Sequence, residues 1–122
     1  MTFQEIIKER ARITEAIRAN IKSSTLGAEE QSTALSELAA INTDYLRLME
    51  DENDAMYASF REGRKAIVEA IKSGAAAKAE HAVRSQYYAN CDKRRAQNQH
   101  TLTRLWDENR AALEAIKEKY QI

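Results

Sequence analysis

Four carboxylates within five positions form the densest group of reactive side chains in the chain. Glu50, Asp51, Glu52 and Asp54 lie in the stretch LMEDENDAM (48–56). Carboxylates bind hard cations or perform acid–base catalysis when they converge in one pocket. On a helix, Glu50, Asp51 and Glu52 point in different directions, and no calcium-loop glycine follows at the required position. The cluster therefore favours a contact with another part of the chain over a metal or catalytic site.

The histidines and the cysteine do not form a recognisable reactive site either. Di-iron sites in helical bundles need Glu-x-x-His pairs, but Lys78 and Gln97 stand three positions before His81 and His100. Cys91 has no zinc-binding spacing to either histidine, and on a helix it would lie roughly 13 Å from His100. A phosphate-cradling glycine loop is also missing. The sequence predicts no metal, no cofactor and no enzymatic activity.

The composition is typical of a helical protein of one domain (1–122). The chain has 122 residues, no proline, three glycines and 7% aromatic residues. Because helix breakers are few, we expect nearly all of it to be helical. The net charge is zero, which argues against recruitment by nucleic acid or a membrane surface. A single cysteine and the lack of a long apolar run predict a cytoplasmic protein without a membrane span.

The spacing of apolar residues predicts three helices, over about 2–22, 29–72 and 75–120. Thr2, with a glutamate three positions later, is a candidate N-cap, and Ser73-Gly74 is a candidate turn. The predicted fold class is all-α. A short N-terminal helix precedes a long antiparallel two-helix hairpin, a coiled-coil or helical-bundle arrangement that we expect oligomerisation to complete.

Charge is distributed unevenly along this predicted hairpin. Residues 28–62 carry two basic and nine acidic groups, and residues 63–122 carry twelve basic and seven acidic groups. A hairpin folded at Gly74 places the acidic cluster opposite the basic triplet of the third helix. We therefore predict a structural charge layer that fixes the register of the two helices. Its members are Glu50, Glu52, Asp54, Lys93, Arg94 and Arg95.

The apolar face of the hairpin is wider than two helices can cover, and the first helix is long enough to cover only about half of it. The remaining surface is a candidate interface, because exposed aromatic side chains commonly anchor protein contacts. The candidate residues are Ile41, Leu46, Tyr88 and Trp106. For Trp106, packing against the first helix is an equally good interpretation.

The stretch FREGRKAIVEAIKSGAAAKAEHAV (60–83) and the stretch TLTRLWDENRAAL (101–113) resemble the hairpin of bacterial chemoreceptor sensory domains. They also resemble the ends of ligand-binding domains in helical transcription regulators. In both, a turn of small residues follows a helix with an A-I-x-x-A-I pattern. The resemblance covers about a third of the chain and assigns no family.

Together these patterns favour a non-enzymatic protein–protein interaction module. It would be a small helical scaffold, adaptor or inhibitor of the kind found among bacterial or phage accessory proteins. Its partner would be another protein, with a homo-oligomer expected. A ligand-sensing helical bundle is the first alternative. A nucleic-acid binder is the second, because Arg84 and Arg104 extend the basic triplet along a helix that also carries tyrosines and Trp106.

Overall fold

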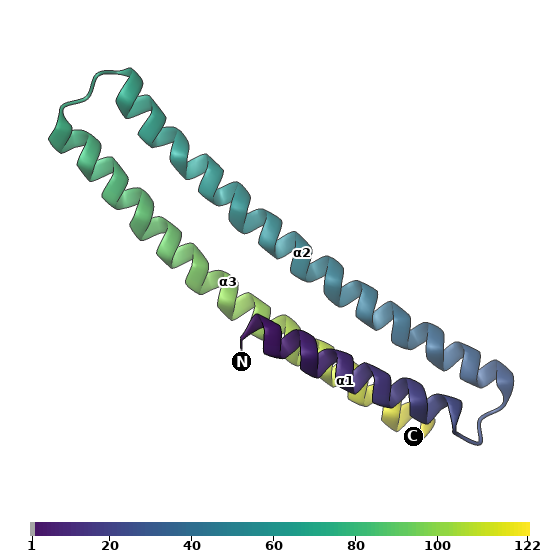
Figure 1. Cartoon of the computed structure of the whole chain (residues 1–122). Helices are drawn as coiled ribbons and strands as arrows, with labels where there is room; N and C mark the ends of the chain where they lie inside the picture. The colour runs from purple at the N-terminus through teal and green to yellow at the C-terminus, as the bar shows by residue number, and fades with distance from the viewer. Residues whose placement is uncertain (1) are drawn as a thin grey trace. The chain divides into compact units, whose positions relative to one another are not determined.

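The computed structural model describes residues 2–122 and consists of three helices, shown in Figure 1. They are α1 (Phe3–Lys22), α2 (Ala28–Lys72) and α3 (Ala77–Tyr120). No strand occurs in this part of the chain. The predicted all-α fold, with one short helix followed by two long ones, is confirmed.

The start of α1 is fixed by a capping box at the predicted position. The Glu5 amide donates to Thr2 Oγ1 at 3.1 Å, and the Thr2 amide donates to a Glu5 carboxylate oxygen at 3.3 Å. Two amides that the helix leaves without a partner are thereby satisfied. The local sequence alone therefore determines where the first helix begins.

The turn between α2 and α3 follows from Gly74, whose φ of 67° lies in the left-handed region. The Gly74 amide donates to the Ile71 carbonyl at 3.2 Å and the Ala75 amide to the Ala70 carbonyl at 3.1 Å. This is the Schellman pattern, which favours glycine at the left-handed position. Because Ala75 is used to close the turn, α3 begins at Ala77, two residues later than we predicted.

Helix α2 continues without a break through Gly63. A side-chain Cβ at this position would lie 3.1 Å from the ring of Tyr87 on α3. The missing side chain therefore lets the tyrosine ring approach the backbone of α2 closely.

The chain divides into two compact units. Unit 1 comprises the described part of Met1–Leu48 together with Arg104–Ile122, and unit 2 comprises Met49–Thr103. Unit 1 therefore contains α1 and one end of each long helix. Unit 2 contains the Gly74 turn and the two helical arms that flank it.

The core of unit 1 is formed by side chains from all three helices. Its buried residues are between 0% and 3% exposed: Ile17, Ile21, Ala34, Leu38, Leu113 and Ile116. Partly buried hydrophobic residues, among them Ile41 and Tyr120, pack against this cluster. Three amphipathic helices thus exclude water from the middle of this unit.

The core of unit 2 is smaller. Met56 and Phe60 from α2 pack with Cys91 from α3, and the ring of Tyr87 lies against them. These three buried residues are between 5% and 9% exposed. Only two helices contribute, so each helix keeps a wide face that unit 2 itself does not cover.

Candidate interaction surface

A polar layer joins the two helical arms of unit 2. Arg94 Nη1 donates to Glu52 Oε1 at 2.7 Å, and the two side chains are 20% and 17% exposed. Asn98 Nδ2 donates to the same oxygen at 3.2 Å and to Asn53 Oδ1 at 3.3 Å. The layer therefore consists of an ion pair and two amides, and of the amides Asn98 donates both to the Glu52 carboxylate and to Asn53.

The structure brings only part of the predicted charge layer together. Glu50, Asp54 and Lys93 lie at the exposed surface. Arg95 forms an ion pair with Asp92 on its own helix, and its guanidinium lies 5.0 Å from the centre of the Phe60 ring. The predicted layer was based on charge alone, so the neutral Asn53 and Asn98 were not among its predicted members. The signal for Asn98 was its polar side chain at an apolar position of α3.

The four predicted interface residues differ in exposure. Leu46 and Tyr88 are 45% and 59% exposed, whereas Ile41 is half-buried against the core of unit 1. Trp106 is only 3% exposed, and its ring meets Tyr45 edge-on at a centroid distance of 6.4 Å. Trp106 therefore lies in the interior of unit 1, where its ring contacts α2.

Unit 2 also exposes large hydrophobic side chains that were not predicted as interface residues. Tyr57, Val68 and Ile71 on α2 are 55%, 45% and 54% exposed, in addition to Tyr88 on α3. Tyr57 packs edge-on against Phe60 at 6.1 Å, and Tyr88 against Tyr87 at 5.4 Å. Two exposed aromatic rings thus rest directly on the edges of the small core. The signal for Tyr57 was its position one residue beyond the buried Met56.

A contact far apart in sequence fixes one corner of unit 1. Lys119 Nζ donates to Glu37 Oε1 at 2.7 Å, and the Tyr120 hydroxyl donates to the same oxygen at 2.9 Å. These hydrogen bonds lower the pKa of Glu37, that from Lys119 most strongly, and the bond to Glu37 raises the pKa of Lys119. Burial, followed by the bond to Glu37, raises the pKa of Tyr120.

Three polar atoms in the interior of unit 1 have no hydrogen-bond partner within residues 2–122: Arg10 Nε, Trp106 Nε1 and Asn109 Oδ1. The Arg10 guanidinium lies 5.0 Å from the centre of the Tyr45 ring, and burial lowers the pKa of this arginine. Asn109 is 5% exposed and lines a groove of about 170 Å³. The groove is otherwise lined by Ile41, Asp44, Tyr45, Leu48, Leu105, Glu108 and Ala112.

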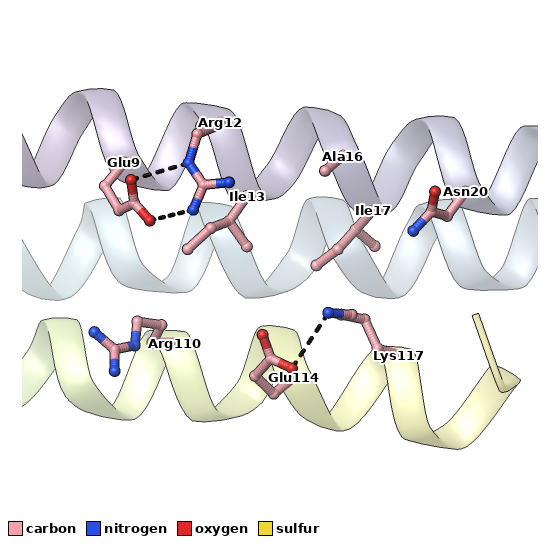
Figure 2. A pocket seen from close by; sticks show the side chains of 9 residues that line it. All are labelled: Glu9, Arg12, Ile13, Ala16, Ile17, Asn20, Arg110, Glu114 and Lys117. Atoms are coloured by element: carbon pink, nitrogen blue, oxygen red, sulfur yellow. Dashed lines mark hydrogen bonds and ion pairs between the residues drawn. The ribbon is translucent and has the colours of Figure 1, made fainter.

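A second groove in unit 1, of about 280 Å³, runs between α1 and α3 (Figure 2). Its wall is charged: Glu9 forms an ion pair with Arg12, and Glu114 lies 3.5 Å from Lys117. The hydrogen bond from Arg12 lowers the pKa of Glu9. Each of these pairs joins neighbouring turns of one helix, so the groove has a solvated rim of paired charges.

Within residues 2–122, no three histidine, cysteine or acidic side chains are grouped so that they could hold a metal ion. In the same residues, none of the helices is long and apolar enough to cross a membrane. Comparison with protein-family models, with curated proteins and with solved structures finds no match to this chain. The arrangement of its own residues is therefore the basis for a functional proposal.

Proposed function

We propose that this chain is a non-enzymatic protein–protein interaction module and that unit 2 presents its binding surface. The observation that carries the proposal is the exposure of four large hydrophobic side chains around a two-helix core: Tyr57, Val68, Ile71 and Tyr88. A helix normally buries its apolar stripe against another element, and two helices alone cover each other only partly. Exposed aromatic residues beside a packed core are typical anchors of protein interfaces.

The charged groups of unit 2 support the same proposal. Glu52 and Arg94 satisfy each other inside the layer, which favours a role in alignment of the helices. Arg84 and Arg95 form ion pairs with acidic residues of α3 itself. The net charge of zero also gives the chain no overall field that would attract a phosphate backbone.

The proposal predicts that a partner depends on the apolar residues of unit 2. The full chain would be immobilised, and bound proteins would be captured from an extract of the source cell. A variant with Tyr57→Ser and Tyr88→Ser should lose the partner. A matched variant with Phe3→Ser and Ile7→Ser removes two similarly exposed side chains from unit 1 and should retain it. Equal capture by both variants would contradict the proposal.

A second candidate function, ligand sensing, is favoured by the groove around Asn109. The buried Asn109 Oδ1 has no hydrogen-bond donor within the described chain, and burying such an acceptor costs about 1–3 kcal/mol. A ligand that fits would therefore bring a donor together with an apolar body. The carboxylates of Asp44 and Glu108 also line the groove. Their ion pairs with Arg47 and Arg104 are exposed and therefore weak, so these carboxylates would still favour a cation. The chemical class is a small amphipathic amine.

Thermal stabilisation by a panel of aliphatic and aromatic amines tests this second candidate. Uncharged alcohols of the same shape serve as the control ligands. An amine that raises the Tm of the wild type should fail to do so for Asn109→Leu, which keeps the volume but removes the acceptor. A similar rise in both proteins would place the amine elsewhere.

A further inference from the structure

An exposed stripe of α2 begins in the acidic cluster and ends near the Gly74 turn. Side chains three or four positions apart share one face of a helix, and here the stripe is composed of Glu50, Asn53, Tyr57, Arg61, Arg64 and Val68. Asn53 is half-buried and the others are exposed. At 100° per residue the stripe is centred about 80° around α2 from Met56, Phe60 and Ile67. It therefore borders the core of unit 2, and Asn53, which accepts from Asn98 in the polar layer, forms the edge of the stripe nearest to α3.

The charges of this stripe are complementary to those of a second copy that runs in the opposite direction and is aligned with the first at Tyr57. Seven positions before Tyr57 stands the acid Glu50, and seven positions after it stands the base Arg64. Four positions away on either side are the neutral Asn53 and the base Arg61, which do not repel each other. Leu46 and Val68 are also equally distant from Tyr57 in the sequence, one before it and one after it.

Two copies of such a helix fit together in only one direction. In an antiparallel pair related by a two-fold axis at Tyr57, residues equally distant from Tyr57 on opposite sides face each other. Glu50 of each copy then meets Arg64 of the other, at both ends of the contact. A parallel pair would instead place Glu50 against Glu50 and Arg64 against Arg64, which is unfavourable.

We propose that the stripe on α2 binds a second copy of this chain, with the two α2 helices antiparallel and Tyr57 packed against its counterpart on the two-fold axis. This inference rests on the proposed function and names the partner of the α2 side of unit 2. Self-pairing of two two-helix units produces four packed helices, a common way to cover such faces. An aromatic residue at the centre with charged flanks matches the anatomy of a small interface.

The contact is that of a dimer in exchange with its monomers. The apolar part of the stripe is short, and the flanking ion pairs are exposed, where each pair contributes about 0–1 kcal/mol. Added salt therefore weakens the association. The direction of the pairing, in contrast, is determined by charge. The charges attract at both ends of an antiparallel pair and repel at both ends of a parallel pair.

Charge reversal tests this direction through sedimentation of the full chain over a range of concentrations. Glu50→Arg alone places arginine against arginine at both ends, and Arg64→Glu alone places glutamate against glutamate. Each variant should self-associate about tenfold more weakly than the wild type. An equimolar mixture of the two variants should regain wild-type association as a heterodimer, and the double variant should regain it as a homodimer.

The matched controls reverse one acidic and one basic residue that lie outside the stripe. Asp51→Arg and Lys65→Glu alter exposed residues next to Glu50 and Arg64 and should leave the association unchanged. A wild-type chain that is monomeric throughout, or single variants whose mixture does not recover, would overturn the inference. The capture experiment described above would still decide the proposed function separately, because it scores any partner that depends on Tyr57 and Tyr88.

A crosslink measures the same geometry without a change of charge. In a Cys91→Ala background, Tyr57→Cys places one thiol of each copy on the two-fold axis, so mild oxidation should yield a disulfide-linked dimer. Ala58→Cys, exposed on the next position of the helix, should yield mostly monomer. Equal crosslinking at the two positions would contradict a two-fold axis at Tyr57.

Discussion

Units 1 and 2 are formed from the same kind of amphipathic helix, yet they differ in how completely their cores are buried. In unit 1, where α1 joins the two long helices, the residues of the central cluster are at most 3% exposed, and the other buried residues Ile6, Tyr45 and Leu105 are 5% to 6% exposed. In unit 2, which has two helices, the core residues are 5% to 9% exposed, and Tyr57 and Tyr88 rest against the edges of the core. The third helix therefore covers the central cluster of unit 1 more completely than two helices cover the core of unit 2.

The polar contacts between helices differ in the same way. In unit 1, the contact beside the buried Thr14 is neutral, with Asn42 Nδ2 donating to Thr14 Oγ1 at 3.3 Å, whereas the ion pair between helices, Lys119 with Glu37, lies at a more exposed corner. In unit 2, the contact between helices is the ion pair of Glu52 and Arg94, whose side chains remain in partial contact with water. A charge is costly in a dry interior and tolerable where water reaches it. The chemistry of each layer therefore follows the degree of coverage.

Core truncation should separate the two units most clearly. Leu38→Ala in unit 1 should lower the free energy of unfolding by about 3–4 kcal/mol, because a fully packed site cannot collapse around the cavity. Met56→Ala in unit 2 should cost only about 2 kcal/mol, since its site is at the edge of a small, partly wetted core. Urea unfolding followed by far-UV circular dichroism, at concentrations that favour the monomer, gives both values. Equal losses would remove the contrast between the units.

Removal of Arg94 should have the next largest effect. Arg94→Ala leaves the half-buried carboxylate of Glu52 without its ion pair, which should cost about 1–2 kcal/mol. Lys93→Ala changes an exposed neighbour and should stay within about 0.5 kcal/mol of the wild type. A variant that exchanges the charges, Glu52→Arg with Arg94→Glu, should recover part of the loss. If urea unfolding gives the same loss of unfolding free energy for Lys93→Ala and Arg94→Ala, the layer does not align the helices.

The smallest effect should be the pH dependence that the Glu37 corner of unit 1 contributes. The folded-state pKa of Glu37 is lowered, so its contribution is present above the pKa of the unfolded carboxyl, about 4.3, and is lost as the pH falls through the folded value. The pKa values of Lys119 and Tyr120 are raised, so their contribution is lost as the pH rises through the folded values, above about 10.

Glu37→Gln isolates the acid limb of this dependence. The difference in unfolding free energy between the wild type and this variant should be largest near neutral pH and should shrink toward pH 3. Urea unfolding at a series of pH values measures it. A difference that does not change with pH would show that the carboxylate is not stabilised by its contact with Lys119.

Much of the architecture could be predicted, because its determinants are local. The capping box at Thr2 and the left-handed turn at Gly74 involve residues within a few positions of each other, and the apolar period identifies a helix without knowledge of its neighbours. The pairing of Glu52 with Arg94 also followed from the position of the turn, since an antiparallel hairpin fixes which residues face each other. Lys93 and Arg95 do not share the contact of Arg94 with Glu52, because side chains at adjacent helical positions point about 100° apart.

The sequence by itself determined the three helices, the position of the reversal and the opposition of an acidic to a basic segment, because these depend on periodicity and on a single turn. Only the tertiary structure decided which side chains are covered. Trp106 is buried against Tyr45, whereas Tyr57 and Tyr88 remain exposed. Coverage depends on which helix packs on which face, and that contact is made by residues far apart in the chain.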